Sequence, residues 1–202
     1  MDKRTRLTIG IAGLVVFAFA LILLLSGHTS SIDDPIRHWF YDLRRDGLND
    51  VIAVFTLLGN WQSITAICIV LLLIPGSRRS FAIPASAGVL AITILNKIIK
   101  HLVQRPRPDD IQFLINEGGF SFPSGHSIAS MFFYGLLLCL VLLEVKNKTL
   151  KIILSVILII LTFGIGLSRI YLGVHYPTDV LAGWALGAAG ISIVIAFAHR
   201  EC

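Results

Sequence analysis

Residues 150–190 read LKIILSVILIILTFGIGLSRIYLGVHYPTDVLAGWALGAAG, two long apolar runs on either side of a short polar segment. Each run approaches the ~20 residues that a helix needs to cross ~30 Å of hydrocarbon. The stretch therefore predicts two membrane-spanning helices, over about 150–168 and 179–198. Their junction lies at one membrane surface and carries most of the polar side chains.

The rest of the chain has the same character. Of its 202 residues, 55% are hydrophobic and 14% are charged, and the mean hydropathy is +0.82. These values are far from those of a soluble globular domain. Four more apolar runs lie at about 7–26, 52–75, 80–102 and 127–144. We therefore predict an all-α fold, a polytopic membrane protein whose residues 1–202 form one domain, a six-transmembrane-helix bundle.

Two of these runs need comment. The first follows three cations and is longer than the core of a signal peptide, with no clear small-residue cleavage site before Gly27, so we expect it to stay as the first helix. The second is interrupted by Gly59 and Asn60. Its first part, Val51 to Leu58, either belongs to the span or lies along the membrane interface.

The distribution of cations predicts the orientation. Both ends of a six-helix chain lie on one side, and the loops of that side hold nine cations against three in the first loop of the other side. Cytoplasmic loops carry the excess of Lys and Arg, so we expect a multi-pass protein of the cell membrane with cytoplasmic termini. The nine are Lys3, Arg4, Arg6, Arg78, Arg79, Lys146, Lys148, Lys151 and Arg200, and the three are Arg37, Arg44 and Arg45.

A separate group of cations departs from this rule and falls on the outer side: Lys97, Lys100, Arg105, Arg107 and Arg169. Most of it belongs to KHLVQRPRP, residues 100–108, where the third helix ends. These side chains either extend to lipid phosphates or bind an anion. The formal net charge of +5 means little as a bulk property, because the cations with a functional role lie together at one membrane face. We therefore expect no nucleic-acid partner.

The fourth helix begins with an unusual polar sequence, PSGHS at residues 123–127. Ser124 is placed to cap the helix, which leaves the N–H groups of Gly125 and His126 free to attract an anion. The alternative is a capped helix with an incidental histidine.

The segment SRIYLGVHYPTD, residues 168–179, places His175 and Asp179 four residues apart. In a helical turn the carboxylate can reach one imidazole nitrogen and leave the other free, which prepares a histidine as a nucleophile. Alternatively, Asp179 or Thr178 caps the last helix behind Pro177, and both statements can hold together.

These three segments meet at one membrane face by a topology that was derived from other residues. Cations, a helix N-terminus and two histidines then surround one place. Such a site suits a tetrahedral anion that is attacked in line, because phosphoryl transfer needs mainly positioning and charge neutralisation. The sequence therefore predicts phosphoryl-transfer chemistry at the extracytoplasmic face.

The same residues resemble the type 2 phosphatidic acid phosphatase superfamily of integral membrane lipid phosphatases. The family pattern has a Lys followed after six residues by Arg-Pro, then Pro-Ser-Gly-His, then Ser-Arg, His and Asp at fixed spacings. Every position is matched here, by Lys100 with Arg107-Pro108, by 123–126, and by Ser168-Arg169 with His175 and Asp179. Residues before 95 match only in architecture.

The resemblance implies a role for each matched residue. His175 is the nucleophile that forms a phosphohistidine, Asp179 holds its ring, and His126 protonates the leaving oxygen and then activates water. The remaining positions bind the substrate phosphate: Lys100, Arg107, Ser124, Gly125 and Arg169. Arg105 is outside the pattern, and we expect it to contact the headgroup or the rim.

The implied function is that of a lipid phosphate phosphatase without metal or cofactor, since fixed cations neutralise the phosphate. Asp109 and Asp110 are the alternative, a carboxylate pair for a metal. Candidate substrates are phosphatidic acid, phosphatidylglycerol phosphate and a polyprenyl diphosphate, selected by the loops 28–50 and 109–119. Two other functions stay open, a lipid phosphotransferase that uses the same phosphohistidine and a non-enzymatic lipid carrier or scramblase.

The last helix also carries a small-residue face, with Gly183 and Gly187 four residues apart in GWALGAAG. Such faces let two helices pack closely. We expect this face to pack within the chain, with a dimer face as the alternative. A monomer is one oligomeric state that the sequence allows.

Overall fold

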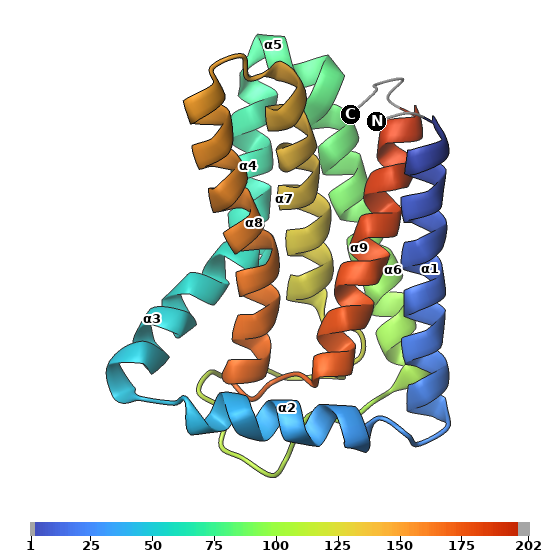
Figure 1. Ribbon diagram of the computed structural model, residues 1–202, viewed down its shortest axis with the longest axis vertical. Coiled ribbons are helices and arrows are strands. Elements are labelled where there is room, and N and C mark those ends of the chain that lie inside the picture. Colours follow the sequence, from blue (N-terminus) through green and yellow to red (C-terminus); the bar gives the residue numbers. More distant parts are fainter. Residues whose placement is uncertain (1–2, 198–202) are drawn as a thin grey trace.

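A computed structural model describes residues 3–197, which form helices and loops with no strand among them (Figure 1). Five helices are long and apolar enough to span a membrane, and the number rises to six when a bent pair, Asp46–Gly59 with Trp61–Leu73, is taken as one broken span. The predicted all-α, six-span membrane fold is confirmed. Its elements are α1 (Lys3–Leu25), α2 (Ser30–Asp42), α3 (Asp46–Thr56), η1 (Leu57–Gly59), α4 (Trp61–Leu73), α5 (Pro75–Ser77), η2 (Arg78–Ala82), α6 (Ile83–Val103), α7 (Gly125–Glu144), α8 (Lys148–Tyr171) and α9 (Pro177–Phe197).

The predicted limits of these spans need small corrections. The helices predicted at 80–102, 127–144 and 150–168 begin or end up to three residues from the predicted positions, and α1 begins four residues before the predicted residue 7. The last helix was predicted to reach residue 198, which lies outside the described residues.

The centre of the bundle is α7, which packs against α6, α8 and α9 (Figure 1). Phe132 and Phe133 follow each other in α7, so they point to different sides of the helix. Phe132 joins a cluster with buried residues of α6 and α9, and Phe133 joins a second cluster with Ile64 of α4 and Ile165 of α8. A helix that is apolar all round is in this way buried on several sides.

The contact between α7 and α9 is unusually close. A Cβ atom added at Gly183 would lie 2.8 Å from the carbonyl oxygen of Ser124, and one added at Gly187 would lie 2.8 Å from that of Ile128. Only glycine permits this approach of two backbones. The small-residue face of α9 thus packs on α7 of the same chain, as predicted.

The second span is broken where the sequence was interrupted. The two halves are bent by 49° at Gly59 and Asn60. Asn60 adopts an extended conformation and caps α4 by accepting a hydrogen bond from the N–H of Ser63. Gly59 has no room for a side chain, because an added Cβ atom would lie 2.3 Å from Ile165 and 3.2 Å from His126. The break therefore brings the chain against the site described below.

Segment 28–50, predicted as a loop, is largely helical, and this expectation is wrong. It contains α2 and the start of α3, and α2 lies across the end of the bundle (Figure 1). Apolar residues such as Ile36 and Phe40 recur at a spacing of four, while Asp33 and Arg37 provide a second face. The run is too short and too charged to span a membrane, so its helical period was overlooked.

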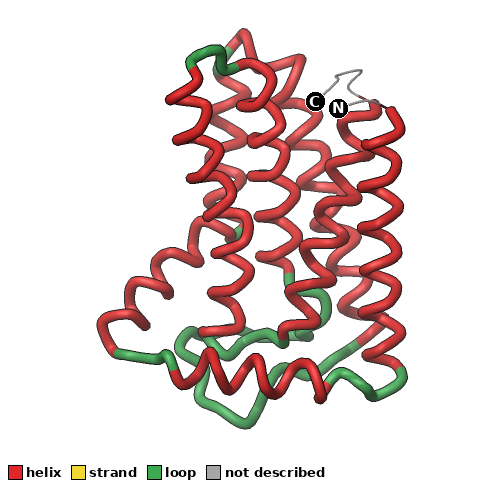
Figure 2. The backbone as a smooth tube through the Cα atoms, viewed as in Figure 1, coloured by secondary structure: helices red, strands yellow, loops and turns green. Residues whose placement is uncertain are grey.

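The loops of the bundle gather at two ends. The first residues of α1 and the last of α9 lie at one end, and the segments 104–124 and 172–176 lie at the other, beside α2 (Figure 2). All of the predicted site residues belong to this second end.

Candidate active site

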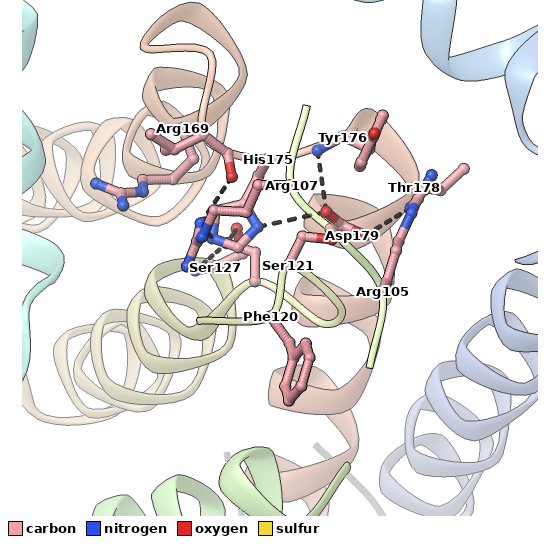
Figure 3. A network of polar contacts seen from close by, with 12 residues as sticks. Arg105, Arg107, Phe120, Ser121, Ser127, Arg169, His175, Tyr176, Thr178 and Asp179 are labelled. Carbon is pink, nitrogen blue, oxygen red and sulfur yellow. Dashed lines mark hydrogen bonds and ion pairs between the residues drawn. The ribbon is translucent and has the colours of Figure 1, made fainter. Parts of the chain in front are cut away.

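The site is assembled from the C-terminal end of α6, the loop 104–124, the N-terminus of α7 and the turn between α8 and α9 (Figure 3). The turn is tight because Gly173 adopts a left-handed conformation with φ of +82°, which glycine tolerates without strain. The N–H of Val174 then returns to the carbonyl of Arg169, over 3.2 Å. This closure brings His175 back over the bundle.

His175 and Asp179 form the predicted pair, and both are buried. The Nδ1 atom of His175 lies 3.4 Å from Oδ2 of Asp179. The same oxygen accepts a hydrogen bond from the N–H of Tyr176 over 3.0 Å, so the carboxylate also caps the start of α9. The capping alternative and the predicted contact with His175 are therefore both realised by one side chain.

The other imidazole nitrogen faces a cation. Nε2 of His175 lies 3.2 Å from Nη1 of Arg107, which also donates to the carbonyl of Val174 over 2.7 Å. Burial, and then the charges of Lys100, Arg107 and Arg169, hold the pKa of His175 well below its ordinary value. His175 is therefore neutral at physiological pH, with a lone pair on the nitrogen that faces the cations.

Two more predicted cations line the same place. Lys100 donates from Nζ to the carbonyls of Phe120 and Ser121, the latter over 3.1 Å. Arg169 is almost fully buried and donates from Nη1 to the hydroxyl of Thr56 over 3.2 Å, while its buried Nε has no partner. An unpaired buried guanidinium donor is costly unless a ligand accepts from it.

Glu117 was missed by the sequence analysis. Its carboxylate forms an ion pair with Arg169 and lies 3.5 Å from Nη2 of Arg107. It thus bridges two of the predicted phosphate-binding arginines, as an anion would. Nothing in its loop sequence, INEGGF, distinguishes it from a solvated acid.

The N-terminus of α7 is built as predicted. Ser124 is the N-cap, with its hydroxyl accepting from the N–H and the hydroxyl of Ser127. Gly125 packs on Asn96 of α6, because an added Cβ atom would lie 2.9 Å from its Nδ2. The amide oxygen of Asn96 is buried without a partner. Asn96 lies one turn before Lys100 and was also missed.

His126 lies within electrostatic range of His175, Arg169, Arg107 and Lys100. It also lines a cavity of about 180 Å³ between α4, α6 and α7. The walls of this cavity are mostly apolar, with Trp61, Ile64 and Ile128, and Asn96 adds a polar group. Such a composition suits the apolar body of a ligand with one polar end.

The expectation for Arg105 is wrong. We expected it to contact a headgroup at the rim, but it is buried and its guanidinium forms ion pairs with Asp33 and Asp179. These ion pairs could not be predicted from the sequence, because Asp33 and Asp179 are each more than 70 residues from Arg105.

Asp109 and Asp110, the candidate carboxylate pair for a metal, have different surroundings. Asp110 forms an ion pair with Arg37 over 2.5 Å, and Asp109 is exposed. Within residues 3–197 no group of three or more His, Cys, Asp or Glu side chains is arranged to hold a metal ion. The loop 104–124 thus uses one of its two adjacent acids to bind α2.

Comparisons with known proteins match this arrangement. The chain is 33% identical over 199 residues to phosphatidylglycerophosphatase B of Bacillus subtilis (strain 168), covering 92% of this chain and 94% of that protein. It is 31% identical over 134 residues to an undecaprenyl-diphosphatase of Sulfolobus acidocaldarius, covering 63% and 58% of the two chains. The crystal structure of a transmembrane PAP2 type phosphatidylglycerolphosphate phosphatase from Bacillus subtilis superposes with a TM-score of 0.81 at 27% identity, over 95% of this chain and 98% of that one.

These relatives are phosphatases of lipid phosphates, and the solved structure is a membrane protein, as this multi-span chain is. The model of the PAP2 superfamily matches residues 81–201, which include all three predicted motifs. The resemblance predicted from those motifs is confirmed, and the chain belongs to the PAP2 superfamily.

Proposed function

We propose that this protein hydrolyses a membrane lipid phosphate through a phosphohistidine at His175, on the extracytoplasmic side of the cell membrane. The observation that carries this proposal is the setting of one imidazole. Its Nδ1 faces the Asp179 carboxylate, and its Nε2 faces Arg107, one of the cations that would hold the phosphate. A histidine held in this way is oriented and neutral, as a nucleophile must be.

In the first step the substrate phosphate takes the place of the Glu117 carboxylate between Arg107 and Arg169. Lys100 and the N–H groups at the start of α7 neutralise its other oxygens. The lone pair of His175 Nε2 attacks phosphorus while the bond to the leaving oxygen breaks. Asp179 stabilises the positive charge that develops on the ring, and His126 gives its proton to the departing alkoxide.

In the second step water attacks the phosphohistidine. His126, now without its proton, accepts one from the water molecule, and the bond between phosphorus and Nε2 breaks. Inorganic phosphate leaves and His175 is neutral again. The fixed cations act in both steps, so the proposed mechanism requires no metal.

The lipid portion of the substrate would occupy the cavity beside His126. Its apolar walls, Trp61, Ile64 and Ile128, suit acyl or prenyl chains, and Asn96 suits a polar group next to the ester oxygen. One relative is named as a phosphatidylglycerophosphatase and another as an undecaprenyl-diphosphatase. Both lipid classes are therefore candidate substrates, with phosphatidic acid as a third. The protein acts as a monomer in this proposal.

Phosphate release tests the proposal and its metal independence. Purified protein is expected to release phosphate from at least one of phosphatidic acid, phosphatidylglycerol phosphate and undecaprenyl diphosphate in excess EDTA. Vanadate should inhibit, because its trigonal geometry imitates the transferring phosphoryl group. An absolute requirement for added Mg²⁺ would instead assign the charge neutralisation to a metal. Product analysis with an acceptor lipid distinguishes hydrolysis from phosphoryl transfer, and a carrier would release no phosphate.

The orientation is tested by chemical labelling. We expect Asp109→Cys, in a background whose three native cysteines are replaced, to react with a membrane-impermeant maleimide from outside intact cells. Thr149→Cys, at the other end of the bundle, should react only after the cells are permeabilised. Both positions are exposed, and neither side chain caps a helix or forms an ion pair in the structure. The reversed pattern would place the site in the cytoplasm.

A further inference from the structure

The Asp179 carboxylate is held from two sides (Figure 3). Its Oδ2 faces His175 and the N–H of Tyr176, whereas its Oδ1 accepts from Nη1 of Arg105 over 2.6 Å. The same Nη1 donates to the hydroxyl of Thr178 over 2.8 Å. Arg105 is 8% exposed and its guanidinium lies 3.7 Å from the centre of the Tyr176 ring. The carboxylate that orients His175 is therefore fixed by a buried cation that no family motif includes.

The second half of this guanidinium is bound to α2. Nη2 of Arg105 donates to Oδ2 of Asp33 over 2.7 Å and to the hydroxyl of Thr29 over 3.2 Å. Asp33 is 1% exposed. It also accepts from the N–H and the hydroxyl of Thr178, each over 2.9 Å. A charged side chain from the helix that crosses the end of the bundle thus reaches the first turn of α9.

The charges of this network have a consequence for the nucleophile. A lone Arg105 beside Asp179 would cancel the negative charge that must stabilise a positive imidazole ring. Asp33 shares Arg105 with Asp179, so these three side chains together keep a net charge of −1 beside His175. In a buried site, where the effective dielectric constant is lower than that of water, that difference acts on the ring more strongly than it would in solvent.

We propose that Asp33 and Arg105 are positioning residues for the reaction, through which α2 holds the Asp179 carboxylate in place and preserves its negative charge. The inference depends on the proposed phosphohistidine mechanism. Neither side chain contacts His175 in the structure, and both act through Asp179.

The test measures the single-turnover rate of phosphoenzyme formation at saturating lipid phosphate, with a ³²P-labelled substrate and protein quenched in alkaline denaturant, in which a phosphohistidine is stable. Asp33→Asn keeps the shape of the side chain and removes its charge, and we expect it to lower this rate about 10- to 100-fold, by analogy with the outer hydrogen-bond partners of metal-ligating side chains. The KM should change little, because Lys100, Arg107 and Arg169 are untouched. The matched control is Asp34→Asn, the adjacent residue, which is paired with Arg37 and should keep the wild-type rate.

A double-mutant cycle separates this role from a general effect on folding. In the Asp179→Asn background, Asp33→Asn should cause no further loss, because the group through which it acts is absent. Arg105→Lys keeps the positive charge but loses the two-nitrogen guanidinium group that binds Asp179 and Asp33 at once. It should also lower the rate, and should cause no further loss in the Asp179→Asn background. It replaces Asp33→Asn if that variant does not fold.

Two results would overturn the inference: a wild-type rate in either folded variant, or an equal loss with and without Asp179. Failure of the mechanism itself would look different. Wild-type protein that releases phosphate without a phosphohistidine would refute the proposed function before any variant is compared.

Discussion

The His175→Ala variant is expected to form no phosphoenzyme and to release no phosphate from any lipid phosphate that the wild-type protein hydrolyses. The reason is geometric. Among the described residues, His175 alone combines a nitrogen held toward a buried carboxylate with a second nitrogen turned to the phosphate-binding cations. His126 cannot replace it, because a group placed to protonate the leaving oxygen lies on the opposite side of an in-line attack.

The measurement is phosphate release over the full panel of lipids, with the alkali-stable, acid-labile fraction of the protein-bound ³²P label as a second readout. The control is His28→Ala, which changes an exposed histidine before α2 and should keep full activity. Thermal unfolding in detergent shows that the variant is folded. Wild-type turnover by folded His175→Ala protein would refute the phosphohistidine mechanism.

The second large effect is expected for His126→Ala, and its size should depend on the leaving group of the substrate, whereas that of His175→Ala should not. A lipid alkoxide needs a proton as it departs, whereas a phosphate that leaves from a diphosphate stabilises its own charge. General acid catalysis contributes ~10²- to 10⁴-fold, so His126→Ala should lose a factor of that order on a lipid monophosphate. On a lipid diphosphate the loss in phosphoenzyme formation should be distinctly smaller.

Steady-state turnover could hide this difference, because His126 is also proposed to activate water in the second step. The rate to measure is therefore the single-turnover formation of the phosphoenzyme, on phosphatidylglycerol phosphate and on undecaprenyl diphosphate. His175→Ala is the matched control, since removal of the nucleophile should eliminate both reactions. Equal losses in His126→Ala on the two substrates would leave His126 with a binding role and no role as an acid.

The spans and the three motifs could be predicted because both signals are local in the sequence. A membrane helix must bury about 20 apolar residues in series, and each motif combines residues that lie within one turn or one helix end. His175 and Asp179 illustrate this, since a spacing of four in a helical turn is enough to bring an imidazole to a carboxylate.

The contacts that the sequence did not predict join distant segments. Arg105 meets Asp33 and Asp179 across more than 70 residues in each direction, and Glu117 meets Arg169 across 52. No periodicity encodes such pairs, so Arg105 was interpreted as a rim contact and Glu117 was not noticed. The helix α2 was missed for a related reason, because its apolar face is defined by the bundle end on which it lies.

The close contact of α7 and α9 also has a consequence for how the lipid preference of such a protein can change. The two helices that carry His126 and Asp179 are set in register by glycines close to the site, where Gly183 meets the backbone of Ser124 at the start of α7 and Gly187 meets that of Ile128 one turn further on. The spacing of the reacting groups is thus defined by the transmembrane scaffold. Glu117 pairs with Arg169, and the carbonyls of Gly118 and Gly119 hold Arg107, so we expect residues 109–116 and the apolar wall of the cavity to tolerate changes of composition while the chemistry stays the same. A chimaera that exchanges these parts with a relative is a practical way to alter lipid preference without rebuilding the catalytic centre.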